Sequence, residues 1–183
     1  HVNLRRHVLP LAQVLAGRLG IPLDKIRLKQ GDSDQLLAGG GTGGSRSAMN
    51  SGSAAVEASA KVIDQGKQIA GHLLEASAGD IEFRAGRFTI AGTDRSIGIL
   101  ELAKKLRTGI TLPPDVPKTL DVSHVSDGVP STYPNGCHIA EVEIDPDTGV
   151  TELKSYITVN DFGTQINPML VEGQIAGGFA HGI

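Results

Sequence analysis

Residues 48–78 read AMNSGSAAVEASAKVIDQGKQIAGHLLEASA and form the longest patterned stretch of this 183-residue chain. One helix face is supplied by five apolar residues, Val56, Ile63, Ile69, Leu73 and Leu74. The many alanines and glycines carry little side-chain bulk, so neighbouring backbone can approach this segment closely. We therefore expect a long Ala-rich helix, with Gly66 and Gly71 as the points at which it divides.

Shorter patterns surround this helix. Leu11, Leu15 and Leu19 recur at helical spacing and predict a helix over 8–19, with Pro10 in its first turn. The alternation in residues 26–29 predicts a short strand, and residues 81–90 predict a β-hairpin. Ser96 is expected to cap a helix that runs to about Leu106.

The second half of the chain predicts another hairpin. Residues 137–144 alternate, which places His138, Ala140, Val142 and Ile144 on one face. A turn at 145–149 joins them to a partner strand at 150–159, and Asn167-Pro168 marks a helix start. The fold class expected is α+β, with helices on mixed or antiparallel sheets. Possible lobes at 1–107 and 136–183 are joined by a Pro-rich crossover, residues 108–135.

Composition excludes several classes of protein. Asp and Glu number 20 against 17 Lys and Arg, and no basic stripe is visible, which argues against nucleic-acid binding. No apolar run approaches the roughly 20 residues of a membrane span, and no signal peptide is visible. The only cysteine, Cys137, excludes an internal disulfide, and the six His have no zinc-ligand spacing with it. A cytoplasmic location is expected, with the periplasm as the alternative.

The glycine cluster at residues 39–47 precedes the long helix. Glycines permit positive φ, so successive N–H groups can converge on an anion, and the following helix adds its own N–H groups and dipole. Thr42, Ser45 and Ser47 add hydroxyls, and Arg46 adds a guanidinium. The pattern favours phosphate binding over a solvated loop. The G-x-G-x-x-G within it lacks the Rossmann context, and no P-loop lysine follows.

Two further polar loops could contribute to a site. Asp32 and Asp34 flank Ser33, and could hold Mg²⁺, act as acid and base, or simply cap their own loop. Residues 160–168 lead into a Gly-rich helix on which Gln174 offers an amide suited to reading a ring edge, or lies exposed at the surface.

Together these loops resemble the large, molybdenum-binding subunit of the xanthine dehydrogenase, aldehyde oxidase and carbon monoxide dehydrogenase superfamily. The similarity rests on three blocks in order, residues 19–26 with 31–34, residues 41–47, and residues 166–168 with 171–174 and 177–178. The resemblance implies a molybdenum ion held by a molybdopterin, in bacteria often the cytosine dinucleotide form. It implies cofactor contacts at Asp32, Ser33, Thr42, Gly43, Gly44, Ser45, Arg46, Ser47, Phe162, Gly163, Asn167 and Gln174.

The resemblance also implies what is missing. Family members have a Gly-Gly-Phe-Gly-type loop upstream and a Gly-Glu-Pro-type segment downstream whose Glu is the catalytic base. Neither is present here, and the sequence stops within a patterned Gly-rich segment. We therefore expect part of a larger molybdenum hydroxylase-type oxidoreductase, with no catalytic residue and no metal ligand of its own. On its own, the chain is expected to bind cofactor weakly or not at all and to be inactive.

Partners expected from the resemblance are a small-molecule substrate, the remainder of the large subunit, an iron–sulfur subunit and a flavin subunit. The identity of the substrate is not encoded in these residues. The alternatives are a phosphate- or nucleotide-binding module without redox chemistry, and a structural domain whose glycines serve packing.

Overall fold

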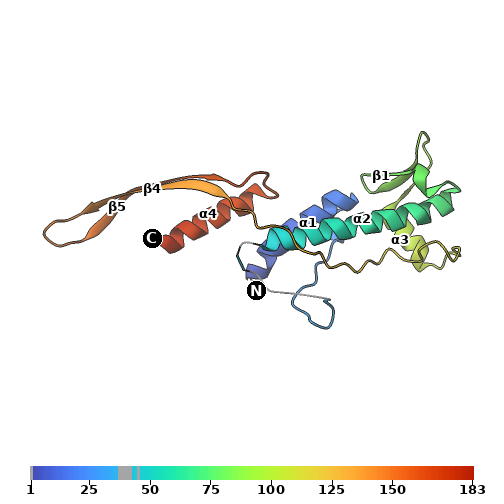
Figure 1. Ribbon diagram of the computed structural model, residues 1–183, viewed down its shortest axis with the longest axis horizontal. Coiled ribbons are helices and arrows are strands. Elements are labelled where there is room, and N and C mark those ends of the chain that lie inside the picture. The colour runs from blue at the N-terminus through green and yellow to red at the C-terminus, as the bar shows by residue number, and fades with distance from the viewer. Residues whose placement is uncertain (1, 37–42, 45) are drawn as a thin grey trace. The chain divides into compact units, whose positions relative to one another are not determined.

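The computed structural model describes residues 2–36, 43–44 and 46–183 (Figure 1). The fold is α+β, as the sequence predicts, and both sheets found among these residues are antiparallel. Two compact units make up the chain, residues 1–129 and 130–183. In the part of the chain described, every helix is too short or too polar to cross a bilayer.

The first unit is built around the predicted Ala-rich helix. Its elements are α1 (Val2–Leu19), η1 (Leu23–Lys25), α2 (Ser47–Leu74), η2 (Ala78–Asp80), β1 (Ile81–Arg84), β2 (Arg87–Ile90), β3 (Ser96–Gly98) and α3 (Ile99–Arg107). α1 packs along α2, and the sheet, in the order β1-β2-β3, packs on the second half of α2 (Figure 1). This arrangement leaves the first turns of α2 away from the sheet.

The core of the first unit lies where α2, the sheet and α3 meet. It comprises Ile69, Ala70, Ile81, Phe88, Ile97, Ile99 and Leu102. Phe88 is fully buried, and its ring centroid lies 4.7 Å from that of Phe83. Gly66 lies directly beneath the ring, because a Cβ built at Gly66 would lie 2.2 Å from Phe88 Cζ. The expected division of the helix at Gly66 or Gly71 is therefore wrong: both glycines lie inside one continuous helix and make room for neighbours.

Helix α2 ends earlier than the pattern predicts. Its C-cap, Glu75, has a left-handed φ of 55°, and Ala76 N–H donates to Gly71 O at 2.8 Å. This closing hydrogen bond satisfies a terminal carbonyl and turns the chain before residue 78. The predicted hairpin at 81–90 is confirmed, with Ala85 and Gly86 at positive φ in its two-residue turn.

Three other local predictions are wrong. Residues 26–29 form no strand: Ile26 is extended, but none of the described strands pairs with this segment. Ser96 does not cap a helix, because it lies in β3 and its hydroxyl accepts from Arg87 Nη2 at 2.8 Å; Gly98 is the N-cap of α3. α1 begins at Val2, so Pro10 lies inside that helix and not in its first turn.

The second unit consists of β4 (Asn135–Ile144), β5 (Thr151–Asp161) and α4 (Pro168–Gly182), which confirms the predicted hairpin and helix start. A β-bulge lies between Glu141 and Val142, where Ser155 and Leu153 are the partners and Lys154 is the additional residue. The bulge changes the alternation of β5. As a result Leu153 shares a face with Tyr156 and with the predicted row His138, Ala140 and Val142.

Acid is expected to weaken the turn between β4 and β5. Backbone N–H groups of Thr148 and Asp147 donate to Asp145 Oδ1 at 2.9 and 2.8 Å, and they hold the pKa of Asp145 below its ordinary value of 3.8. Because the pKa is lower in the folded turn than in the unfolded chain, the carboxylate stabilises the turn above pH 3.8. That contribution is lost as the pH falls through the lowered value.

The measurement for this prediction is the NMR signal of the Thr148 amide during an acid titration. The signal should move toward its unfolded position in the wild type. In Asp145→Ala it should already lie there at neutral pH, whereas Asp147→Ala, which leaves the acceptor in place, should behave as wild type. An Asp145→Ala titration identical to wild type would contradict the assignment.

Candidate functional site

The start of α2 places a guanidinium beside a turn that has no acidic residue. The N-cap, Arg46, makes no side-chain hydrogen bond to the first turn, and that turn contains no acidic residue. Gly44 has a φ of 58°, and Arg46 Nε donates to Gly43 O at 3.4 Å. The exposed guanidinium and the positive end of the helix dipole thus lie at one place. Thr42 and Ser45, also predicted here, lie outside the described residues.

The Asp32 loop is ordered by its own side chain. Asp32 Oδ1 accepts from Asp34 N at 3.1 Å, Oδ2 accepts from the side-chain amide of Gln35, and Asp32 O accepts from the N–H groups of Gln35 and Leu36. These contacts are those of a loop cap, one of the three roles that the sequence left open. Ser33 is exposed within the same turn. Among the described residues, no three His, Cys, Asp or Glu side chains gather where they could hold a metal ion.

A cavity of about 470 Å³ adjoins the first turns of α2. Its polar lining is Gln35, Asn50, Ser51, Ser123, His124 and Ser126. Leu36, Ala54, Val122 and Val125 supply apolar surface, and none of the described residues that line the cavity carries a carboxylate or ammonium group. The lining is therefore neutral apart from the imidazole, and it combines amide and hydroxyl groups with apolar walls, which suits an uncharged polar ring.

One wall of this cavity belongs to the Pro-rich stretch, whose length suggested a crossover or binding loop but none of whose residues was among the predicted site residues. Residues 122–128 come from the Pro-rich stretch that follows α3, and they lie against α2 through His124 and Ser126. The residues in contact are more than 60 positions apart in the chain, so no local pattern reveals the pairing. The unusual length of this stretch without periodicity was the one available signal.

The second polar loop lies in the second unit. Asp161 Oδ1 accepts from Gly163 N at 2.8 Å, and Gly163 has a φ of 62°. Asn167 caps α4, since its Oδ1 accepts from Leu170 N at 3.1 Å. Phe162 and Gln174 are exposed. The predicted site residues thus form two sets, one in each unit, and each set is ordered by hydrogen bonds of its own loop.

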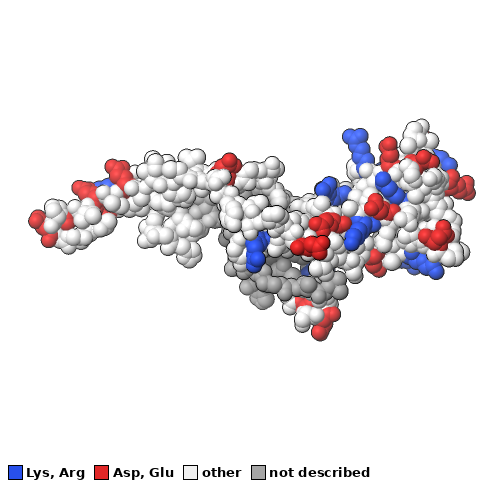
Figure 2. All heavy atoms as spheres, in the orientation of Figure 1, with Lys and Arg blue, Asp and Glu red and all other residues white. Residues whose placement is uncertain are grey.

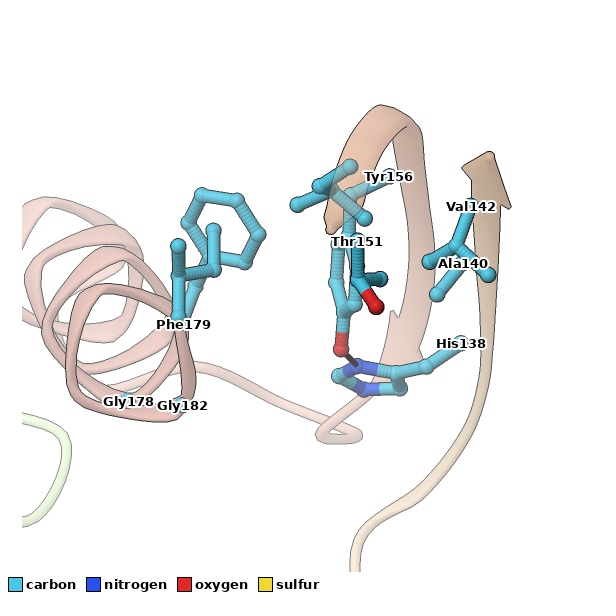
Figure 3. Close-up of a pocket in the computed structure, with 10 residues that line it drawn as sticks. His138, Ala140, Val142, Thr151, Tyr156, Gly178, Phe179 and Gly182 are labelled. Carbon is cyan, nitrogen blue, oxygen red and sulfur yellow. Dashed lines mark hydrogen bonds between the residues drawn. The ribbon is translucent and has the colours of Figure 1, made fainter. Parts of the chain in front are cut away.

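A second cavity, of about 520 Å³, lies between the hairpin and α4 (Figure 3). Tyr156 faces Phe179 from α4, with ring centroids 4.6 Å apart, and its hydroxyl lies 2.7 Å from His138 Nδ1. His138 Nε2 lies 3.2 Å from Asn160 Oδ1, an acceptor, so Nε2 carries the proton and the Tyr156 hydroxyl donates to Nδ1. This chain of hydrogen bonds fixes the His138 ring at the polar end of an otherwise apolar cavity.

On the face shown in Figure 2, Lys and Arg alternate with Asp and Glu over the first unit and form no stripe. The charge distribution on this face therefore offers no track for a phosphate backbone.

Comparison with known proteins identifies the family to which the chain belongs. Residues 7–183 match the model of a molybdopterin cofactor-binding domain. This chain belongs to that family. The molybdopterin-binding domain is 36% identical over 173 residues to the carbon monoxide dehydrogenase large chain of Afipia carboxidovorans. It is 32% identical over 176 residues to the gamma subunit of the 6-hydroxypseudooxynicotine dehydrogenase complex of Paenarthrobacter nicotinovorans. Each match covers 94% of this chain.

Solved structures agree with the sequence matches. A crystal structure of the Cu,Mo-CO dehydrogenase superposes with a TM-score of 0.81 at 37% identity, over 92% of this chain and 21% of that one. Quinoline 2-oxidoreductase from Pseudomonas putida 86 gives a TM-score of 0.71 at 36% identity. The chain spans 21% and 22% of the length of the two relatives named above. Relatives of this molybdopterin-binding domain are thus molybdenum oxidoreductases, and a module without redox chemistry gains no support.

Proposed function

We propose that the chain forms part of the cofactor site of a molybdenum hydroxylase-type oxidoreductase and holds the phosphates and base of a molybdopterin cytosine dinucleotide. The observation that carries this is the juxtaposition of the start of α2, which has Arg46 beside it and no acidic residue in its first turn, and a cavity one turn further along that helix, whose described lining has no carboxylate or ammonium group. Phosphates fit the former, and a pyrimidine fits the latter. When bound, the cofactor supplies the hydroxylation and two-electron chemistry, and the protein supplies its position.

The residues of the first unit would act in binding and orientation. Arg46 and Ser47, with the backbone of Gly43 and Gly44, would hold the phosphates at the helix dipole. Asn50 and Ser51 present an amide and a hydroxyl to the cavity, where they can pair with the edge of a base. Asp32 has both carboxylate oxygens engaged by its own loop, and this reduces its repulsion of a phosphate nearby.

The residues of the second unit supply the remaining proposed contacts with the cofactor. Phe162, Gly163, Asn167 and Gln174 belong to a loop and a helix start whose backbone is already fixed by Asp161 and Asn167. Phe162 and Gln174 are exposed, and in this proposal their side chains contact the pterin part of the cofactor. The remainder of the large subunit, iron–sulfur and flavin subunits and a small-molecule substrate complete the enzyme, in the cytoplasm or the periplasm.

The first unit is tested by titrating the isotope-labelled chain with cytidine 5′-diphosphate and following backbone amides by NMR. We expect weak binding, with a Kd of roughly 1 mM, because only part of the site is present. The shifts should fall on residues 46–51 and 122–128. Pyrophosphate alone should shift only the start of α2. Identical shifts from both probes would contradict the assignment of the cavity to the base.

A substitution at Arg46 tests the contribution of its guanidinium separately from that of the rest of the site. Arg46→Ala removes a charge-assisted hydrogen bond worth about 1.5–3 kcal/mol, so the affinity for both probes should fall at least about tenfold. Arg107→Ala, which removes an exposed arginine from the end of α3, is the matched control and should leave both titrations unchanged. Equal titrations of Arg46→Ala and wild type would exclude Arg46 from the site.

A further inference from the structure

Four side chains join the Pro-rich segment to α2. His124 Nε2 lies 2.5 Å from Glu57 Oε2, His124 Nδ1 lies 2.9 Å from Lys61 Nζ, and Ser126 Oγ donates to Glu57 Oε1 at 3.1 Å. An ammonium group can only donate, so Nδ1 accepts from Lys61 and Nε2 donates to the carboxylate. The His124 side chain is 15% exposed, against 44% for Glu57. The imidazole is therefore the enclosed centre of the network.

The network continues a single stripe of α2. Asn50, Ala54, Glu57 and Lys61 follow one another at intervals of four, three and four residues, which places them on one helix face. Asn50 and Ala54, in the first half of the stripe, line the cavity. Glu57 and Lys61, in the second half, hold His124. The segment fixed at Glu57 and Lys61 thus lies opposite Asn50 and Ala54 as the other wall of the cavity.

Among the described residues, the packing of the Pro-rich stretch on the core ends before this segment. Apolar side chains of the Pro-rich stretch pack on the core at Leu112, Val116 and Leu120, but not beyond. Residues 121–134 contain no helix or strand, and Val125 is 58% exposed. After Leu120 the hydrogen bonds of His124 and Ser126 with Glu57 tie the cavity wall to α2.

We propose that His124 is a positioning residue that fixes residues 122–128 on α2 and so shapes the cavity for the base of the bound nucleotide. The part of this inference that concerns the nucleotide rests on the proposed function. The cavity wall itself is defined without the nucleotide, by the contacts of His124 and Ser126 with Glu57 and of His124 with Lys61.

The test compares His124→Ala, His124→Gln and His72→Ala in two measurements on the whole chain. The first is ¹⁵N relaxation of residues 121–128, and the second is titration with cytidine 5′-diphosphate. In His124→Ala we expect order parameters to fall from about 0.85 to below about 0.6 and the affinity to fall about tenfold. Gln keeps an N–H that reaches Glu57, so His124→Gln should restore most of both. His72→Ala alters an exposed histidine at the end of α2 and should change neither.

The outcomes separate the two proposals. An ordered segment in His124→Ala overturns the positioning role, whether or not the nucleotide binds. A mobile segment with unchanged nucleotide affinity overturns the link between the wall and the ligand, as does failure of His124→Gln to restore affinity. If wild type shows no nucleotide binding while His124→Ala mobilises the segment, the proposed function fails and the positioning of the wall stands.

Discussion

Purified as the 183-residue chain, the protein is expected to carry well below one molybdenum per chain and to show no turnover. In the proposed function the described residues hold the phosphates and the base, but the loops that the resemblance implies on either side of this region are not in the sequence. The chain spans about a fifth of its relatives' length, so most contacts of a bound cofactor would come from elsewhere. Each missing charge-assisted hydrogen bond weakens binding by about 1.5–3 kcal/mol.

Metal analysis by plasma mass spectrometry and a dye-linked oxidation assay measure this result. The control is the large chain of the Afipia carboxidovorans relative, produced in the same host and purified in the same way, because it shows that the host delivers the cofactor. Stoichiometric molybdenum in the 183-residue chain, or turnover above the level of an unrelated protein, would show that these residues hold the cofactor without help. The proposal that this chain supplies only part of the cofactor site would then be wrong.

Elements whose signal is local were predicted well. The apolar face of α2, the turn at 85–86 and the alternation of His138, Ala140 and Val142 each depend on neighbours in sequence, and the structure confirms them. Residues 26–29 show the limit of this reasoning. Their alternation gives extended backbone, but a strand requires a partner, and the pattern cannot say whether one exists. The prediction that Ser96 caps a helix is wrong for a similar reason. Ser96 pairs with β2, and this pairing outweighs its preference for an N-cap position.

The candidate site also has one part that could be predicted from the sequence and one part that could not. The anion-binding role proposed for the start of α2 could be predicted, because it depends on glycines, hydroxyls and a guanidinium that are neighbours in sequence just before a helix. The cavity beside it was not, because its far wall depends on His124 meeting Glu57, which lies 67 residues earlier in the chain. Neither residue is unusual in its own segment, and only the packing of residues 122–128 on α2 shows that they form one feature.

Gly66→Ala is expected to destabilise the wild-type chain and to stabilise a Phe88→Ala variant. Removing the fully buried ring of Phe88 should cost about 3–5 kcal/mol. In the wild type, a Cβ at Gly66 would lie 2.2 Å from that ring, and overpacking of this kind costs about 1–3 kcal/mol. When the ring is absent, the added methyl group instead occupies vacated space, and alanine is favoured over glycine within a helix by about 1 kcal/mol.

Urea unfolding followed by far-UV circular dichroism measures this cycle, since α2 is the longest of the described helices. The matched control is Gly52→Ala, a buried glycine of the same helix whose added Cβ would meet no atom of the described residues within 4 Å. It should be neutral or stabilising in both backgrounds. For Gly66 the sign should reverse, with a coupling energy in the range of about 0.5–3 kcal/mol between the two sites. An equal effect of Gly66→Ala with and without the ring would mean that the packing of α2 against Phe88 does not define this core.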